Sequence, residues 1–230
     1  MPKRIAVLAS GSGSNMQAII DHLDGAGGAR AGEVVLVASD RVSAGALARA
    51  RDRGIQSVAL DREMRSGALA PLLAAHGVEL VVLAGYLRFV PSEVTRTYRG
   101  RVLNIHPALL PAFGGPGMYG HHVHEAVIAR GTRVSGATVH FVDEEYDHGP
   151  IIAQWPVPVW PHDTPAALAA RVLKVEHLLY PRVVQRVCEG TISLGADGRV
   201  HGGAALPAAE HFALTDTDAD VAAHIGAVIP

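Results

Sequence analysis

The sequence predicts a doubly wound α/β domain whose sheet is mostly parallel, followed by antiparallel strands toward the C-terminus. In the first half of the chain, short runs made mostly of apolar residues alternate with amphipathic segments of about a dozen residues. Strands that are buried on both faces have such runs, and helices between them allow them to lie parallel. In the second half, two extended runs meet at an acidic turn, which favours antiparallel pairing.

Each element of this pattern has a signal of its own. The runs that predict buried strands are rich in Val, Leu, Ile and Ala, and they span residues 5–9, 34–38, 57–60, 80–84 and 102–106. Apolar positions at helical spacing predict helices between the first four of them, at residues 15–23, 44–53 and 67–76. Residues 107–122 are rich in Pro and Gly and predict a long irregular loop, which is uncommon unless it is functional.

Beyond this loop the pattern changes to longer elements. Residues 134–142 and 151–159 are expected to form strands, and residues 164–189 one long helix. Ala196-Asp197-Gly198 favours the turn of a short hairpin, and an Ala-rich tail follows it.

The composition fits one domain with a C-terminal extension. The chain has 230 residues, 49% of them hydrophobic, which is enough for a full core without disulfides. Cys188 is the single cysteine, so no internal disulfide can form. We expect residues 1–190 to form the main domain, and residues 191–230 to form a hairpin and tail that pack on it or trail from it.

The net charge and the N-terminal residues bear on three classes of protein: nucleic-acid-binding, membrane-bound and secreted. The formal net charge is -2, which disfavours nucleic acid and membrane surfaces as partners. The apolar run near the N-terminus spans only residues 5–9, which is too short for a secretion signal or a membrane span. We therefore expect a cytoplasmic protein. The sequence leaves the oligomeric state open, with a homodimer as one option.

A glycine-rich turn, Gly11-Ser12-Gly13-Ser14-Asn15, follows the first strand and opens the first helix. Backbone amides at such a turn bind anions, with the helix dipole behind them. Met16 replaces the third glycine of a dinucleotide fingerprint, and the Lys-Ser/Thr pair of a Walker loop is missing. We therefore expect one phosphate monoester here, although a tight turn with Ser14 or Asn15 capping the helix explains the same residues.

Asp40 ends the second strand, where a dehydrogenase places the acid that binds a ribose. Capping of the helix that follows explains this aspartate more simply.

Asn104 and His106 lie two residues apart on the fifth strand, so both side chains point to the same side at its carboxyl end. An amide can donate to a developing oxyanion, and an imidazole exchanges protons near neutral pH. No Ser or Cys stands beside them, which favours direct transfer through a tetrahedral intermediate over a covalent acyl-enzyme. A carboxylate from the turn at residues 143–147 would favour the charged form of His106. Local hydrogen bonds in the loop would explain Asn104 and His106 about equally well.

The other histidines do not form a metal-binding pattern. His121, His122 and His124 stand just before a predicted helical run, but their spacing matches no zinc site and no Cys is near. We therefore expect no metal. His140 alternates with apolar neighbours, and it either faces the site or is a hydrogen-bonded core residue.

Three segments together resemble the phosphoribosylglycinamide formyltransferases, a branch of the 10-formyltetrahydrofolate enzymes. They are the turn at residues 11–15, the stretch Asn-Ile-His-Pro-Ala-Leu-Leu-Pro at residues 104–111, and residues 135–150. The resemblance covers about residues 4–190, which would then be a catalytic domain with a Rossmann-like formyltransferase fold. It implies that the formyl group of 10-formyltetrahydrofolate is transferred to the amine of glycinamide ribonucleotide, in de novo purine biosynthesis and without a metal.

The same resemblance implies roles for individual residues. The catalytic residues would be Asn104, His106 and Asp147. The acceptor's phosphate and ribonucleotide would be bound by Gly13, Ser14, Asn15, Ile105, Pro107 and Glu176. The folate would be bound by Leu87, Arg88, Phe89, Val90 and Val142, with Arg65 facing its glutamate tail. Two features depart from the family: Ala108 replaces a serine, and the loop at residues 113–120 is longer than usual.

Three other functions are weighed against this one. Methionyl-tRNA formyltransferase shares the Asn-x-His-Pro core, but it needs a basic C-terminal domain for tRNA. Formyltetrahydrofolate hydrolase shares the core too, but it carries an N-terminal regulatory domain, and here the first strand begins near residue 4. A non-catalytic phosphosugar-binding module would leave Asn104, His106 and Asp147 without a shared purpose.

Overall fold

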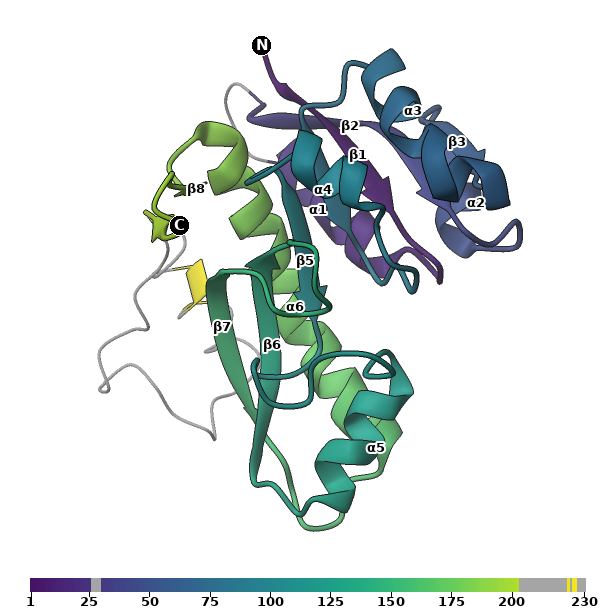
Figure 1. The fold of residues 1–230 in the computed structure, drawn as a ribbon. Helices are drawn as coiled ribbons and strands as arrows, with labels where there is room; N and C mark the ends of the chain where they lie inside the picture. Colours follow the sequence, from purple (N-terminus) through teal and green to yellow (C-terminus); the bar gives the residue numbers. More distant parts are fainter. Residues whose placement is uncertain (26–29, 203–222, 224, 227–230) are drawn as a thin grey trace.

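The computed structural model describes residues 1–25, 30–202, 223 and 225–226, and within them a seven-stranded sheet forms the centre of the fold (Figure 1). Its strands are β1 Lys3–Leu8, β2 Gly32–Ser39, β3 Gln56–Ala59, β4 Leu80–Leu83, β5 Val102–His106, β6 Val134–Phe141 and β7 Ile151–Pro158. Their order across the sheet is β3-β2-β1-β4-β5-β6-β7. The first five pair in parallel, and β6 and β7 are antiparallel to their neighbours. The predicted fold class is therefore confirmed.

Helices cover both faces of this sheet. They are α1 Ser14–Gly25, α2 Gly45–Asp52, the π-helical turn η1 Met64–Ala68, α3 Leu69–Ala75, α4 Ser92–Thr97, α5 His121–Ala129 and α6 Pro165–Glu189. Alternate residues of β1 serve the two faces: Ile5 and Val7 pack with α1, α2 and α6, while Ala6 and Leu8 pack with α3 and α4. This two-sided burial explains why the strand reads as an unbroken apolar run.

The long helix α6 runs along one face of the sheet behind β5, β6 and β7 (Figure 1). Thr164 caps its N-terminus by accepting a hydrogen bond from the backbone N–H of Ala167, and Gly190 ends it with a φ of 77°. The buried hydroxyl of Tyr180 lies 3.0 Å from the carbonyl oxygen of Leu83 and 3.1 Å from that of Leu103. These contacts fix α6 against the carboxyl end of β4 and the first residues of β5.

Two predicted boundaries differ from the structure, one short helix was not predicted, and the predicted hairpin is confirmed. The predicted loop ends earlier than residue 122, because α5 begins at His121 and carries the three clustered histidines on its first turn. The short helix α4 was not predicted, and the predicted helix at 67–76 begins with the π-helical turn. The hairpin is formed by β8 Ser193–Leu194 and β9 Val200–His201, which pair antiparallel.

The boundary at residue 190 stays a prediction, and most of the tail beyond residue 202 lies outside the described residues. Within the described ranges, no helix combines the length and the apolar character that crossing a bilayer needs.

Candidate active site

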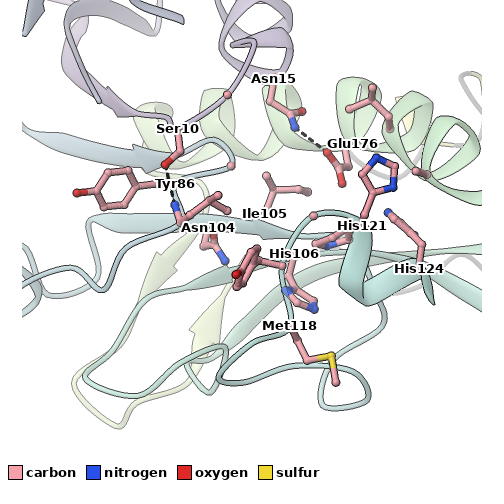
Figure 2. A pocket seen from close by; sticks show the side chains of 18 of the residues that line it. Ser10, Asn15, Tyr86, Asn104, Ile105, His106, Met118, His121, His124 and Glu176 are labelled. Atoms are coloured by element: carbon pink, nitrogen blue, oxygen red, sulfur yellow. Dashed lines mark hydrogen bonds between the residues drawn. The ribbon is translucent and has the colours of Figure 1, made fainter. Parts of the chain in front are cut away.

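A cleft of about 830 Å³ opens beyond the carboxyl ends of β1, β4 and β5 (Figure 2). Its walls come from the turn after β1, the first turn of α1, the loop after β4, the long loop at 107–120, and the side of α6. Parallel strands bring these loops to one edge of the sheet. The predicted residues Ser14, Asn15, Leu87 and Glu176 line this cleft.

The end of β5 places Asn104, Ile105, His106 and Pro107 along the floor of the cleft. Asp147 approaches them from the turn between β6 and β7. The Nδ2 atom of Asn104 lies 3.4 Å from Oδ1 of Asp147, and Nδ1 of His106 lies 3.5 Å from its Oδ2. The structure therefore brings together the three residues that were expected to be catalytic.

Asp147 is held in place from a second direction. Its Oδ2 atom accepts a hydrogen bond of 2.9 Å from the backbone N–H of Gly115, in the long loop. Asp147 also has a φ of 55°, a left-handed conformation in which Asp is several-fold more frequent than most residues. The long Pro- and Gly-rich loop thus has a structural role in orienting the acidic turn.

The His106 ring lies between two acceptors. Its Nε2 atom donates to the carbonyl oxygen of Phe113 at 2.8 Å, and its Nδ1 atom faces the carboxylate of Asp147. Burial lowers the pKa of His106 below its usual value, and the charge of Asp147 and the bond to Phe113 oppose that shift. The geometry suits an imidazolium, because both ring nitrogens face oxygens that can only accept.

His140 orients the amide of Asn104. The antiparallel register of β6 places it directly opposite Asn104, and its Nε2 atom lies 3.0 Å from the Asn104 Nδ2 atom. The Nδ1 atom of His140 donates to the carbonyl of Phe141 at 2.8 Å, so Nε2 accepts in the neutral ring. Burial lowers the pKa of His140, which keeps the ring neutral. Both options that the sequence left open for His140 hold, because it is a buried, hydrogen-bonded residue that also lies beside Asn104 at the site.

Asn15 and Glu176 meet at the far side of the cleft, although 161 residues separate them in the chain. The Nδ2 atom of Asn15 donates to Oε2 of Glu176 at 2.6 Å (Figure 2). The Oδ1 atom of Asn15 is buried and has no protein partner among the described residues. Burial raises the pKa of Glu176 to about 7, and the bond from Asn15 opposes the shift.

Gly13 gives the turn before α1 its shape. Its φ is 78°, and a Cβ atom at this position would lie 2.7 Å from the Cα of Ala46. Both observations exclude a side chain here, so the turn can approach α2 closely. Ser14 and Asn15 line the cleft at the N-terminus of α1, a position that favours an anion.

A second cavity of about 70 Å³ adjoins the cleft. Arg88, Phe89, Val90 and Val142 line it, as expected for residues predicted to share one ligand. Cleft and cavity share Tyr86, Asn104, Tyr146 and Asp147 in their walls, so they meet at the catalytic cluster. The side chain of Arg65 lies outside the described part of the structure.

One prediction about this region is wrong. Asp40 does not cap α2, because that helix has Ala44 as its N-cap and no side-chain cap. The carboxylate instead accepts hydrogen bonds from Ser10 and Arg88. Sequence reasoning also missed Ser10 and the orienting role of His140. Only a polar residue at the end of a buried strand marks Ser10, and the register that pairs His140 with Asn104 is not encoded locally.

Two of the three histidines on α5 lie at the wall of the cleft. His121 and His124 line the cleft, and His124 is buried (Figure 2). Burial lowers the pKa of His124 to about 4, and the charges of His121 and His106 add to the shift. Among the described residues, no three His, Cys, Asp or Glu side chains gather in a way that could hold a metal ion.

The raised pKa of Glu176 predicts a stability that depends on pH. Because folding raises this pKa from 4.5 to about 7, the folded state disfavours the charged carboxylate. The free energy of unfolding should therefore fall as the pH rises from about 4.5 to about 7, by on the order of 3 kcal/mol. Urea unfolding at about pH 5 and about pH 8 measures this change.

The matched variant is Glu176→Gln, which keeps the shape but cannot ionise. Its unfolding free energy should lack this part of the pH dependence, whatever its absolute stability. An equal pH dependence in both proteins would contradict the assignment.

Comparison with known proteins identifies the family. Residues 3–184 match the formyl transferase family model. A chloroplastic phosphoribosylglycinamide formyltransferase of Arabidopsis thaliana is 46% identical over 203 residues, which cover 85% of this chain and 69% of that protein. Its counterpart in Vigna unguiculata is 44% identical over 85% of this chain and 64% of its own length. A glycinamide ribonucleotide transformylase 1 from Symbiobacterium toebii has a similar structure, with a TM-score of 0.78, 40% identity, and coverage of 87% of this chain and 93% of that one. The chain therefore belongs to the phosphoribosylglycinamide formyltransferase family.

Proposed function

We propose that the protein transfers the formyl group of 10-formyltetrahydrofolate to the amine of glycinamide ribonucleotide, which gives formylglycinamide ribonucleotide for purine biosynthesis. The observation that carries this proposal is the meeting of two cavities at Asn104 and Asp147. A reaction between two substrates needs two binding spaces that open onto one set of reacting groups. The names and similarity of the relatives support the same reaction.

The acceptor would occupy the large cleft. Its phosphate would bind the backbone amides at Gly13, Ser14 and Asn15, where the turn and the helix dipole favour an anion. The buried pair of Asn15 and Glu176 offers an amide oxygen and a carboxyl group to the polar groups of the ribonucleotide. Ile105 and Pro107 would pack beneath the acceptor, which directs its amine toward Asn104 and His106.

The donor would enter through the second cavity. Leu87, Arg88, Phe89, Val90 and Val142 would surround the folate ring system, with Leu87 at the entrance to the larger cleft. The Phe89 and Tyr146 rings meet edge to face with their centroids 5.0 Å apart, which gives this cavity an apolar wall for a flat ring. Contact between Arg65 and the glutamate tail stays a prediction.

The chemical step follows from the three clustered residues. The amine attacks the formyl carbon, and a C–N bond forms as the carbonyl oxygen becomes an oxyanion. Asn104 would exchange its 3.4 Å contact with Asp147 for a hydrogen bond to this oxyanion. His106, once protonated between Asp147 and Phe113, would place a positive charge beside it. As the oxyanion collapses, the bond between the formyl carbon and N10 of the folate breaks. Asp147 would pass the proton that the amine loses to this leaving nitrogen, directly or through water.

The test is the absorbance change on loss of the formyl group from 10-formyl-5,8-dideazafolate, measured with and without glycinamide ribonucleotide. We expect turnover only when the ribonucleotide is present. Equal turnover without it would point to a hydrolase, and no turnover in either mixture would contradict the proposal. A cytoplasmic location and a homodimer stay predictions from the sequence, and gel filtration of the full chain tests the latter.

A further inference from the structure

Ser10 connects the end of β1 to the loop that follows β4. Its backbone N–H donates to the carbonyl of Gly85 at 3.0 Å, and its Oγ atom accepts from the backbone N–H of Leu87 at 2.9 Å. Figure 2 draws the second bond as the dashed line at Ser10. Ser10 is only 2% exposed, so water competes little for these bonds. Ser10 thus holds the loop at two points, Gly85 and Leu87.

Asp40, at the end of β2, determines which way the Ser10 hydroxyl points. The hydroxyl donates its single hydrogen to Oδ1 of Asp40 at 2.5 Å. A carboxylate can only accept, so this hydrogen is committed, and the lone pairs of Oγ stay available for the N–H of Leu87. The Asp40 side chain is 2% exposed, which strengthens a bond to a charged acceptor.

The same carboxylate holds the loop at a second point. The Nε atom of Arg88 lies 3.2 Å from Oδ2 of Asp40, although the Arg88 side chain is 65% exposed. Asp40 therefore fixes two successive residues of the loop, Leu87 through Ser10 and Arg88 directly. The following residues, Phe89 and Val90, line the second cavity.

We propose that Ser10 and Asp40 are positioning residues that set the affinity for the folate donor by holding the loop at residues 85–90. Neither residue needs to contact the donor for this effect. The inference rests on the proposed function in one respect, namely that this loop forms part of the donor site. The role proposed for Asp40 is to hold this loop, which differs from both helix capping and ribose binding.

The first experiment measures equilibrium binding of 10-formyl-5,8-dideazafolate by fluorescence titration. Ser10→Ala and Asp40→Ala should each weaken binding by about tenfold, because a buried bond to a charged group is lost and the Leu87 N–H is left without its fixed acceptor. Asp40→Asn should weaken it less, because its amide oxygen still accepts from Ser10. In turnover, the KM for the donor should rise by similar factors, while kcat changes by less than about twofold.

Ser135→Ala is the matched control. Ser135 is as buried as Ser10, and its hydroxyl has no hydrogen-bond partner among the described residues. It lies in β6, away from the loop, so its removal should leave binding of the donor analogue unchanged. Thermal unfolding of all four variants checks that each is folded at the assay temperature.

A second readout, hydrogen–deuterium exchange, does not depend on any substrate. In the free protein, the peptide that covers residues 84–90 should exchange faster in Ser10→Ala and Asp40→Ala than in the wild type, while the peptide that covers β5 does not change. If the exchange rises but binding of the analogue stays within about twofold of wild type, the role of the pair is only structural and the inference is wrong. Unchanged exchange would overturn it as well. Wild-type protein that fails to transfer formyl groups would instead contradict the proposed function.

Discussion

Replacing Asp147 with asparagine is expected to lower kcat by about 10²–10⁴, the range that a positioned proton-transfer group contributes. The variant keeps the size of the side chain and an oxygen that can accept from Gly115. It removes the negative charge 3.5 Å from His106, which opposes the effect of burial, so the already lowered pKa of that imidazole should fall further. The positive charge beside the oxyanion and the proton relay are lost together.

The measurement is kcat at saturating donor and acceptor between about pH 6 and pH 9, together with the equilibrium affinity for the donor analogue. Affinity should change little, because Asp147 acts on the reacting atoms. Glu144→Gln is the control from the same turn: Glu144 is exposed and paired with Arg96, and its loss should leave kcat within about twofold. An Asp147→Asn enzyme with more than about a third of wild-type kcat would remove Asp147 from the mechanism.

Replacing Asn104 with alanine is expected to lower kcat by about 10²–10³, as for the loss of one preorganised oxyanion donor, or about 3–4 kcal/mol. Asn104 is oriented before substrate arrives, because its Nδ2 atom lies 3.0 Å from the Nε2 of His140. The loss should appear in kcat with little change in either KM, since the oxyanion exists only in the transition state and intermediate.

His140→Gln extends this test. A glutamine can accept from Asn104 but lacks the fixed geometry of the ring, so kcat should fall by less than in Asn104→Ala. The measurement is kcat of purified variants in a stopped assay. Thermal unfolding of the same variants shows whether a lower kcat comes from misfolding. If Asn104→Ala stays within about threefold of wild type, the oxyanion assignment is contradicted.

Local spacing in the sequence was enough for most of the fold. The mostly apolar runs predicted each of the first five strands to within a few residues, because the positions of β1, β2 and β4 that pack against helices on both faces are apolar. Period-two geometry placed Asn104 and His106 on one side of β5. The helix α4 was missed because its six residues carry too short a pattern to read.

The roles of Glu176 and Asp147 were predicted from the resemblance, and the structure shows why local spacing could not predict them. Asn15 and Glu176 are 161 residues apart, and α6 brings them together because Tyr180 fixes that helix to β4 and β5. Asp147 reaches His106 because β6 pairs antiparallel with β5, and the turn between β6 and β7 then places its carboxylate 3.5 Å from the His106 ring.

The sequence by itself determined the strands, the glycine-rich turn before α1 and the chemical types at the end of β5, since each depends on residues close together in the chain. Tertiary structure alone decided the partners of Asp40 and His140. A carboxylate at the end of a strand can cap the next helix or bind a neighbouring loop, and here the adjacent strand β1 offers the Ser10 hydroxyl at 2.5 Å. The choice depends on which strand ends lie side by side, and sheet order follows from the packing of the whole domain.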